Sequence, residues 1–286
     1  MDCINKKDII LKLREKSGVR GASLPRDIDF FIKDKILYVN VKKTVQNMQA
    51  NGAAFEGWIL LIKSWLEEYI DKVELDYIVP EIKESYGSSK AGHYNRFLYR
   101  LYNMLRLFPN WFTVNESKKY IIDNFIYWLK SNECLLNHSL KERKSVIGTD
   151  HMERKVESWF VYHDGKHLLE KVWNIDSNKL YNQLPMGVFL KEIKADNAIF
   201  TRTASAIDLW GIGKDNNSLH IIELKCKDNI GLGVISELLF YTFVIYDVCI
   251  NKNSLFEFSK NNAKVTEDIK AIRNNGNKFS KLYTHI

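Results

Sequence analysis

Apolar residues recur at three- and four-residue intervals along much of the first half of the chain. This spacing is typical of helices that bury one face, and it predicts helices over 4–16, 55–70, 91–108 and 117–129. Two short β-rich runs, 28–32 and 36–41, predict a hairpin around a charged turn. Strict alternation over 73–79 predicts a half-buried strand that ends before Pro80. The first half is therefore expected to be α+β.

The second half has a different pattern, in which short apolar runs alternate with polar turns. It predicts a helix over 150–162, a strand over 188–190 after the turn at 185–187, and a helix over 234–250 that is apolar on almost every side. Residues 168–173 fit either a strand or a helix. Since 132–152 is polar and charged, we place the boundary within it and expect two domains, 1–145 and 146–286, the first of them serving substrate recognition.

One hairpin in this half gathers charged residues on one face. Two β-rich runs, 205–211 and 219–226, flank a polar turn. If the turn is centred between Asp215 and Asn216, equal steps outward place Asp208 opposite Glu223. Alternation puts Lys225 on the same face as Glu223. A slip of one residue would turn Asp208 to the other face.

The predicted pairing has a chemical consequence. Opposed cross-strand residues have Cβ atoms about 4.5–5.5 Å apart, and like charges there repel. A divalent cation would offset that repulsion, because Mg²⁺ is commonly held by one or two carboxylates together with phosphate oxygens and water. Lys225 would then hold the scissile phosphate or help to deprotonate the attacking water. The alternative is a solvated strand face with a surface ion pair.

These residues resemble a known signature. Asp208 followed by Glu223-Leu224-Lys225 resembles the PD-(D/E)xK, or restriction-endonuclease-like, nuclease superfamily, with Ile207 where that family often has proline. Glu237 and Tyr241 are similar to the Q-x-x-x-Y pattern on the next helix, with glutamate in place of glutamine. The segment 156–160 is similar to the leading helix, whose acidic residue would be Glu157. The resemblance covers about half of the chain.

The resemblance implies a mixed β-sheet flanked by helices, and hydrolysis of phosphodiester bonds with Mg²⁺, for which Mn²⁺ can substitute. The implied metal ligands are Asp208, Glu223 and Glu157, with a backbone carbonyl near Leu224. The implied catalytic residues are Asp208, Glu223, Lys225, Glu157, Glu237 and Tyr241. From burial alone, Glu237 is expected to be bonded to Lys225, to support the metal ligands from behind, or to be exposed.

Basic residues suggest where a nucleic acid would bind. His93, Arg96 and Arg100 fall at helical spacing among tyrosines, a mixture that can follow a phosphate backbone and stack on bases. Lys227 lies in a loop with two glycines after the Lys225 strand. The alternative is a solvated basic face over a core of tyrosine and leucine. The formal charge of +7 and the pI of 9.0 agree with an anionic partner.

Composition narrows the classes of protein to which the chain can belong. Hydrophobic residues make up 45% and charged residues 27%, which argues against extended disorder. The four cysteines lack C-x-x-C spacing, so we expect reduced thiols, no zinc site and a cytoplasmic protein. No secretory signal or membrane-spanning run is evident, so no membrane partner is expected. DNA is preferred over RNA as the partner, and a homodimer is left open.

The sequence thus supports a metal-dependent nuclease, or more narrowly an endonuclease, of the kind used in restriction and defence or in DNA repair. An inactive nuclease-like protein that binds nucleic acid or acts as a scaffold is the alternative. The missing proline and the glutamate at 237 keep that alternative open. A hydrolase of another phosphorylated substrate is a third hypothesis.

Overall fold

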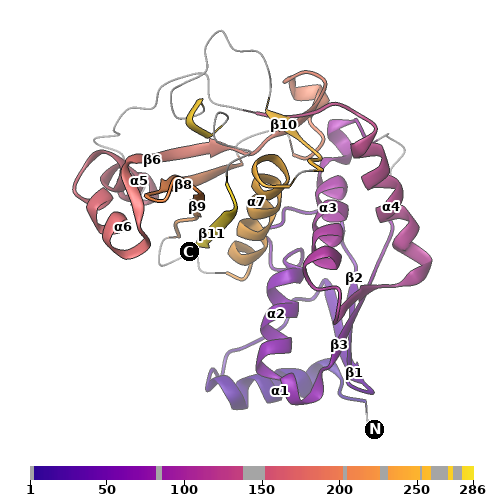
Figure 1. Cartoon of the computed structure of the whole chain (residues 1–286). Coiled ribbons are helices and arrows are strands. Elements are labelled where there is room, and N and C mark those ends of the chain that lie inside the picture. The colour runs from indigo at the N-terminus through magenta and orange to yellow at the C-terminus, as the bar shows by residue number, and fades with distance from the viewer. Residues whose placement is uncertain are drawn as a thin grey trace. The chain divides into compact units, whose positions relative to one another are not determined.

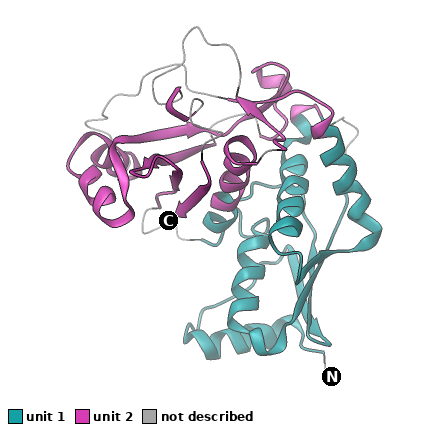
Figure 2. Cartoon of the chain, viewed as in Figure 1, with its two compact units in different colours: residues 1–86, 90–128, 231–237 teal, residues 87–89, 129–230, 238–286 magenta. Residues whose placement is uncertain are grey.

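The chain forms two compact units (Figure 2). The computed structural model describes residues 3–81, 86–137, 152–201, 205–225, 231–251, 253–258, 270–272 and 279–286. Unit 1 comprises residues 1–86, 90–128 and 231–237, and unit 2 comprises 87–89, 129–230 and 238–286. Both units combine helices with a mixed sheet, so the expected mixed α/β, or α+β, fold class is found.

Unit 1 is built on a four-stranded sheet. Its strands are β1 (Ile28–Lys33), β2 (Ile36–Val41), β3 (Lys72–Tyr77) and β4 (Phe112–Val114), in that spatial order. The pair β1–β2 is the predicted antiparallel hairpin, whereas β2–β3 and β3–β4 are parallel. Because parallel neighbours need crossover connections, helices separate these strands in the chain.

Four helices accompany this sheet along the chain (Figure 1). They are α1 (Lys6–Ser17), α2 (Phe55–Trp65), α3 (Gly92–Leu107) and α4 (Glu116–Lys130), with short 3₁₀ turns at Glu67–Tyr69 and Ser89–Ala91. Asn5 caps α1 by accepting the amide protons of Lys7 and Asp8, and Gly18 ends it at a φ of 69°. All four helices were predicted from periodicity, within a few residues at each end.

An ion pair lies in the core of unit 1. Arg100 on α3 donates from Nε to Glu56 Oε1 on α2 at 2.6 Å, and its Nη2 donates to Glu56 Oε2 and, at 2.8 Å, to the Ala53 carbonyl oxygen. The two side chains are 2% and 0% exposed. Buried charges are tolerated when they are paired and fully hydrogen-bonded, and this pair joins α2 to α3.

A segment distant in sequence belongs to the same unit. Ser236 Oγ donates to Glu56 Oε2 at 2.8 Å, and a Cβ on Gly57 would lie 2.7 Å from the Leu232 carbonyl oxygen. A Cβ on Gly233 would lie 2.1 Å from the Gln49 carbonyl oxygen. Glycine is therefore required for these close backbone approaches, and residues 231–237 are held in unit 1 by backbone packing as well as by hydrogen bonds.

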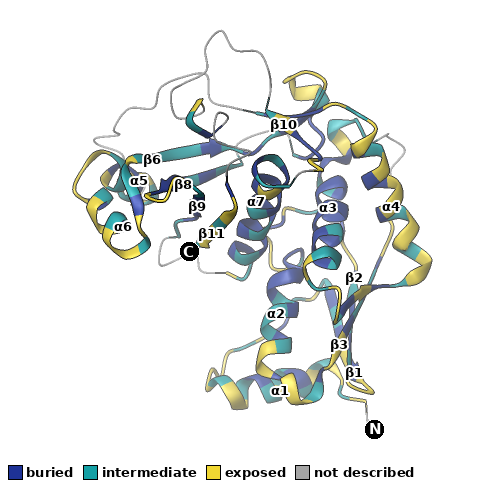
Figure 3. Ribbon diagram, in the orientation of Figure 1, coloured by how far each residue is buried: buried dark blue, intermediate teal, exposed yellow. Residues whose placement is uncertain are grey.

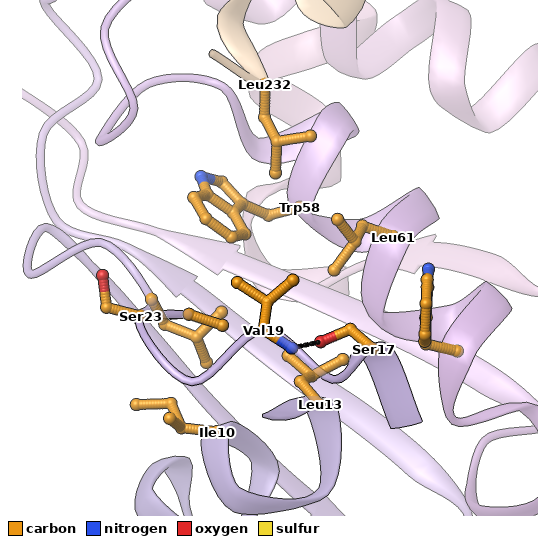
Figure 4. Close-up of a pocket in the computed structure, with 11 residues that line it drawn as sticks. Ile10, Leu13, Ser17, Val19, Ser23, Trp58, Leu61 and Leu232 are labelled. Carbon is orange, nitrogen blue, oxygen red and sulfur yellow. Dashed lines mark hydrogen bonds between the residues drawn. The ribbon is translucent and has the colours of Figure 1, made fainter. Parts of the chain in front are cut away.

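Unit 1 also contains an apolar cavity of about 350 Å³ (Figure 4). Its wall includes side chains of α1, α2 and the loop after α1, among them Leu13, Val19, Trp58 and Leu61, and it is completed by Leu232. Ser17 Oγ accepts the Val19 amide proton at 3.2 Å. No titratable side chain contributes to this wall, so the cavity offers no acid–base chemistry.

Unit 2 contains two sheets. One has the order β10 (Glu257–Phe258), β5 (Cys134–Leu136) and β7 (Val188–Leu190). The other has the order β11 (Lys281–His285), β9 (Ser218–Ile222), β8 (Ala206–Gly213) and β6 (Ile175–Pro185). In the second sheet β9–β8 and β8–β6 are antiparallel, and β11–β9 is parallel.

The described part of unit 2 includes the helices α5 (Met152–Tyr162), α6 (Gly165–Trp173) and most of α7 (Gly233–Cys249), a 3₁₀ turn at Ala195–Asn197, and a helical segment at 270–272. Residues 168–173 are therefore helical. A buried hydrophobic cluster joins α6 to the second sheet; its members are Leu169, Ile175, Leu180, Leu209 and Ile222. The partly buried side chains of Phe160, Val161, Trp173 and Leu224 pack against this cluster.

The predictions of the remaining elements and of the domain boundary are confirmed only in part. Periodicity predicts α5 and α7 well, but it does not predict β6, β11 or the pairing of β5 with β7. The first unit ends near residue 128 and includes 231–237, a grouping that a single boundary in the sequence cannot give. Within the described ranges, no helix is both long and apolar enough to span a bilayer.

Candidate functional site

The β8–β9 hairpin has the predicted register. Leu209 pairs with Ile222 and Gly211 with His220, so one further step of the ladder places Asp208 opposite Glu223. The turn is fixed by Asp215, whose Oδ1 accepts amide protons from Asn217 and Ser218, both at 2.9 Å. The symmetric turn sets the register, and the register brings the two acidic positions together where the strands end.

Asp208 is held at the end of β8 by a backbone contact. Its Oδ2 accepts the Leu224 amide proton at 2.8 Å. Burial raises the pKa of Asp208 to about 7, and the negative charges of Glu157 and Glu153 also raise it. The Leu224 amide and the charge of Lys225 act in the opposite direction. The carboxyl is therefore poised between its charged and neutral forms near neutral pH.

Glu157 on α5 reaches the same location through a glutamine. Gln183 Nε2 on β6 donates to Glu157 Oε2 at 2.9 Å and to Asp208 Oδ1 at 3.4 Å. Glu157 is only 5% exposed. Of the two acids on α5, Glu157 is the one that Gln183 joins to Asp208.

Lys225 and Glu223 form an ion pair. Lys225 Nζ lies 2.6 Å from Glu223 Oε1, and the two side chains are 13% and 4% exposed. The predicted common face of these residues is confirmed by this contact. Glu223 is also fixed through its backbone, since its amide proton goes to the His285 carbonyl oxygen on β11 at 3.0 Å.

Two of the three expected metal ligands lie close enough together to suit a hard divalent cation. No group of three acidic, histidine or cysteine side chains close enough to hold a metal occurs among the described residues, so the three expected ligands do not converge in this arrangement. Asp208 and Glu157 nevertheless meet at one amide, and two carboxylates suffice for Mg²⁺ when phosphate oxygens and water complete its shell. The residues present thus fit a two-carboxylate site, with Glu223 held back by Lys225.

The two residues expected on the next helix lie in different environments. Glu237 is 4% exposed, and its Oε1 accepts a hydrogen bond from Gln49 Nε2 at 2.6 Å within unit 1. Of the three expectations for Glu237, exposure is therefore wrong. Tyr241 is 1% exposed and its ring lies 5.9 Å from that of Phe240, which is the position of a core residue.

The expected nucleic-acid contacts on α3 need correction. Arg96 and Arg100 are only 4% and 2% exposed (Figure 3 shows α3 largely buried), and Arg100 is neutralised by Glu56. These arginines form no exposed basic face, because the charges point into the unit. His93 is half-buried, and burial lowers its pKa below the usual value. Lys227 lies outside the described residues.

A second polar cluster in unit 2 was not predicted. Ser218 Oγ donates to Asp215 Oδ1 at 2.7 Å, and His220 Nε2 lies 3.4 Å from Ser218 Oγ. His220 Nδ1 then lies 3.1 Å from His285 Nε2, with the two ring planes within 3° of each other. Burial lowers the pKa of His220 to about 4 and also lowers that of His285. The two imidazoles are therefore neutral near pH 7, whereas hydrogen bonds from Asn217 and Ser218 lower the pKa of Asp215 and keep it ionised. The contact between the two rings links β9 to β11.

No protein-family model, curated protein or solved structure matches this chain.

Proposed function

We propose that this protein is a metal-dependent nuclease that hydrolyses phosphodiester bonds of nucleic acid, with DNA as the preferred substrate and a site at Asp208, Glu157, Glu223 and Lys225. Restriction-type defence and DNA repair are the processes that this chemistry would serve. The proposal keeps the restriction-endonuclease-like core expected from the resemblance.

One observation carries the proposal. Around Asp208 the described side chains bring together the carboxylates of Glu157 and Asp208 through one amide, and the pair Glu223–Lys225 follows at the end of the adjacent strand. Among the described side chains that these contacts join, three are acidic and one is basic, in a largely buried place. Such an excess is costly unless protons or a cation offset it, and the raised pKa of Asp208 reflects that cost.

Each residue has a role that its contacts suggest. Asp208 and Glu157 would hold the cation, and the Leu224 amide orients Asp208 by its bond to Oδ2. A divalent cation bound here would lower the pKa of a coordinated water and offset charge on the phosphate. Lys225 would turn from Glu223 to the phosphate, so that the carboxylate of Glu223 becomes available at the site. In this exchange the Glu223–Lys225 pair would open as the phosphate binds.

A second candidate function has its own support. The Glu223–Lys225 pair already neutralises both groups, and three ligands do not converge among the described side chains. Both facts suit an inactive nuclease-like protein that binds nucleic acid or serves as a scaffold. The two candidates differ in one respect, since only the first requires cleavage that depends on the cation.

Cleavage of single- and double-stranded DNA and RNA panels tests the proposal. The wild-type chain is expected to cleave at least one substrate with Mg²⁺ or Mn²⁺ and to stop in excess EDTA. Asp208→Asn and Lys225→Met should reduce the rate by at least about 10²-fold, the usual scale for a lost charge-stabilising group. Lys179→Met, on the same unit and paired with Asp176, is the matched control and should leave the rate unchanged. Wild-type binding to nucleic acid without cleavage would favour the scaffold instead.

A further inference from the structure

Gln183 occupies an unusual backbone position beside the candidate site. It lies in β6, where Asn182 pairs with Leu209 and Leu184 pairs with Ile207 on β8, so its place in the ladder faces Asp208. Its φ is +57°. This value belongs to the left-handed region, which a residue with a Cβ rarely adopts and which is foreign to a regular strand.

The residue type makes the backbone conformation informative. Glycine adopts a positive φ without steric cost, and asparagine tolerates it because its short side chain bonds locally. Glutamine has neither advantage. A strained residue persists where the surroundings over-determine it, and such residues cluster at functional sites. The glutamine side chain therefore has a use that glycine at position 183 would not provide.

The contacts of the side chain indicate that use. A single amide nitrogen donates to Glu157 Oε2 at 2.9 Å and to Asp208 Oδ1 at 3.4 Å, which joins a helix residue to a strand residue. An ionised carboxylate has about four lone-pair sites. One amide contact to each acid fixes their relative position, and a cation would bind at other lone pairs of the same two carboxylates.

We propose that Gln183 is a positioning residue that holds Glu157 and Asp208 at one shared cation site, and that the strain at its backbone is retained for this purpose. The inference rests on the proposed function, because it assigns to Gln183 the alignment of two of that function's ligands. The competing explanation is structural: the left-handed residue would only bend β6 ahead of the turn at 185–187.

Gln183→Gly separates the two explanations, because it removes the amide and relieves the backbone. The variant should unfold at the same temperature as the wild-type chain or a higher one, while its affinity for Mn²⁺, measured by calorimetry, falls by about 10- to 100-fold, the usual effect of losing a partner of metal ligands. Gln183→Asn keeps a side chain that tolerates the positive φ but is one methylene shorter. It should lose affinity as well.

Lys191→Gly is the matched control. Lys191 also has a positive φ, of 60°, in unit 2, and it is exposed. The same substitution there should change the unfolding temperature in the same direction and leave Mn²⁺ affinity at the wild-type value.

The outcomes distinguish this inference from the function on which it rests. Wild-type affinity in Gln183→Gly or Gln183→Asn would overturn the positioning role and leave the nuclease proposal intact. A large loss of stability in Gln183→Gly with unchanged affinity would establish the structural explanation instead. If the wild-type chain itself fails to bind Mn²⁺, the proposed cation site fails, and the positioning role fails with it.

Discussion

Both units bury charged side chains, and they balance the charges differently. In unit 1, Glu56 and Arg100 share two hydrogen bonds, and Ser236 and the Ala53 carbonyl satisfy further polar atoms. In unit 2, Glu157 and Asp208 meet at a neutral amide, and the nearby ammonium of Lys225 is bonded to Glu223. One acid faces one base in unit 1, whereas the described side chains that these contacts join in unit 2 are three acids and one base.

The comparison separates a structural pair from a candidate site. Arg100 is unavailable to a phosphate because its guanidinium is only 2% exposed and is already paired with a carboxylate. Burial, with a smaller contribution from the negative charges of Glu157 and Glu153, raises the pKa of Asp208, so the folded chain can gain free energy there by taking up a proton or a cation. The same burial therefore has opposite consequences in the two units.

The largest expected effect comes from breaking the balanced pair. Arg100→Met would leave Glu56 buried without its cation, and removing one partner of a buried pair typically costs about 3–5 kcal/mol of unfolding free energy. Urea unfolding at pH 7 measures this loss. The double variant Glu56→Leu/Arg100→Met removes both charges and should recover a large part of it. A loss below about 1 kcal/mol in the single variant would show that the pair contributes little to the core.

The second-largest effect should be an increase in the free energy of unfolding. Asp208→Asn removes a charge whose folded pKa, about 7, is above its ordinary value of 3.8. The wild-type stability contributed by this raised pKa is full below pH 4 and is lost as the pH rises through 7. Without metal, the variant should therefore be more stable than the wild-type chain at pH 8, by up to about 4 kcal/mol, and equal to it near pH 4. Lower stability of Asp208→Asn at pH 8 would contradict the idea of unbalanced acid.

The smallest effect concerns the histidine pair of unit 2. The pKa of His220 is lowered to about 4 from 6.5 by burial, with His285 lowering it further and Asp215 opposing. The contribution of a depressed histidine is full above pH 6.5 and is lost as the pH falls toward 4. His220→Gln should therefore gain about 1–2 kcal/mol relative to the wild-type chain between pH 7 and pH 5. Urea unfolding of both chains at each pH measures this difference, and no relative change would show that the pair is not titrated in this range.

Much of the fold follows from local patterns, and the exceptions have identifiable causes. Helices such as α4 and α7 are readable because their apolar spacing is local. In strand β6, the typical turn residues Asp176, Ser177 and Asn178 follow Ile175. They fall at the register shift between Ile175 and Leu180, so the strand depends on the pairing with β8 on either side of them. The placement of 231–237 in unit 1 depends on contacts such as the one between Ser236 and Glu56, separated by 180 positions.

Some features of the candidate site likewise follow from local sequence patterns, and others do not. The pairing of Asp208 with Glu223 follows from a symmetric turn, and the face shared with Lys225 follows from alternation. Nothing in the sequence pattern predicts a role for Gln183, because its function depends on a backbone angle. The partner of Arg100 lies 44 residues away on another helix, so helical spacing alone suggested a basic surface where the fold forms a buried pair.

Titration of the chain with Mn²⁺ by calorimetry tests the central claim most directly. We expect the wild-type chain to bind one ion, Asp208→Asn and Glu157→Gln to weaken binding by at least about 10-fold, and Asp176→Asn, a carboxylate of the same unit that is paired with Lys179, to bind as the wild-type chain does. Equal binding by all four chains, or no binding by the wild-type chain, would contradict the assignment of a cation site to the excess acid around Asp208.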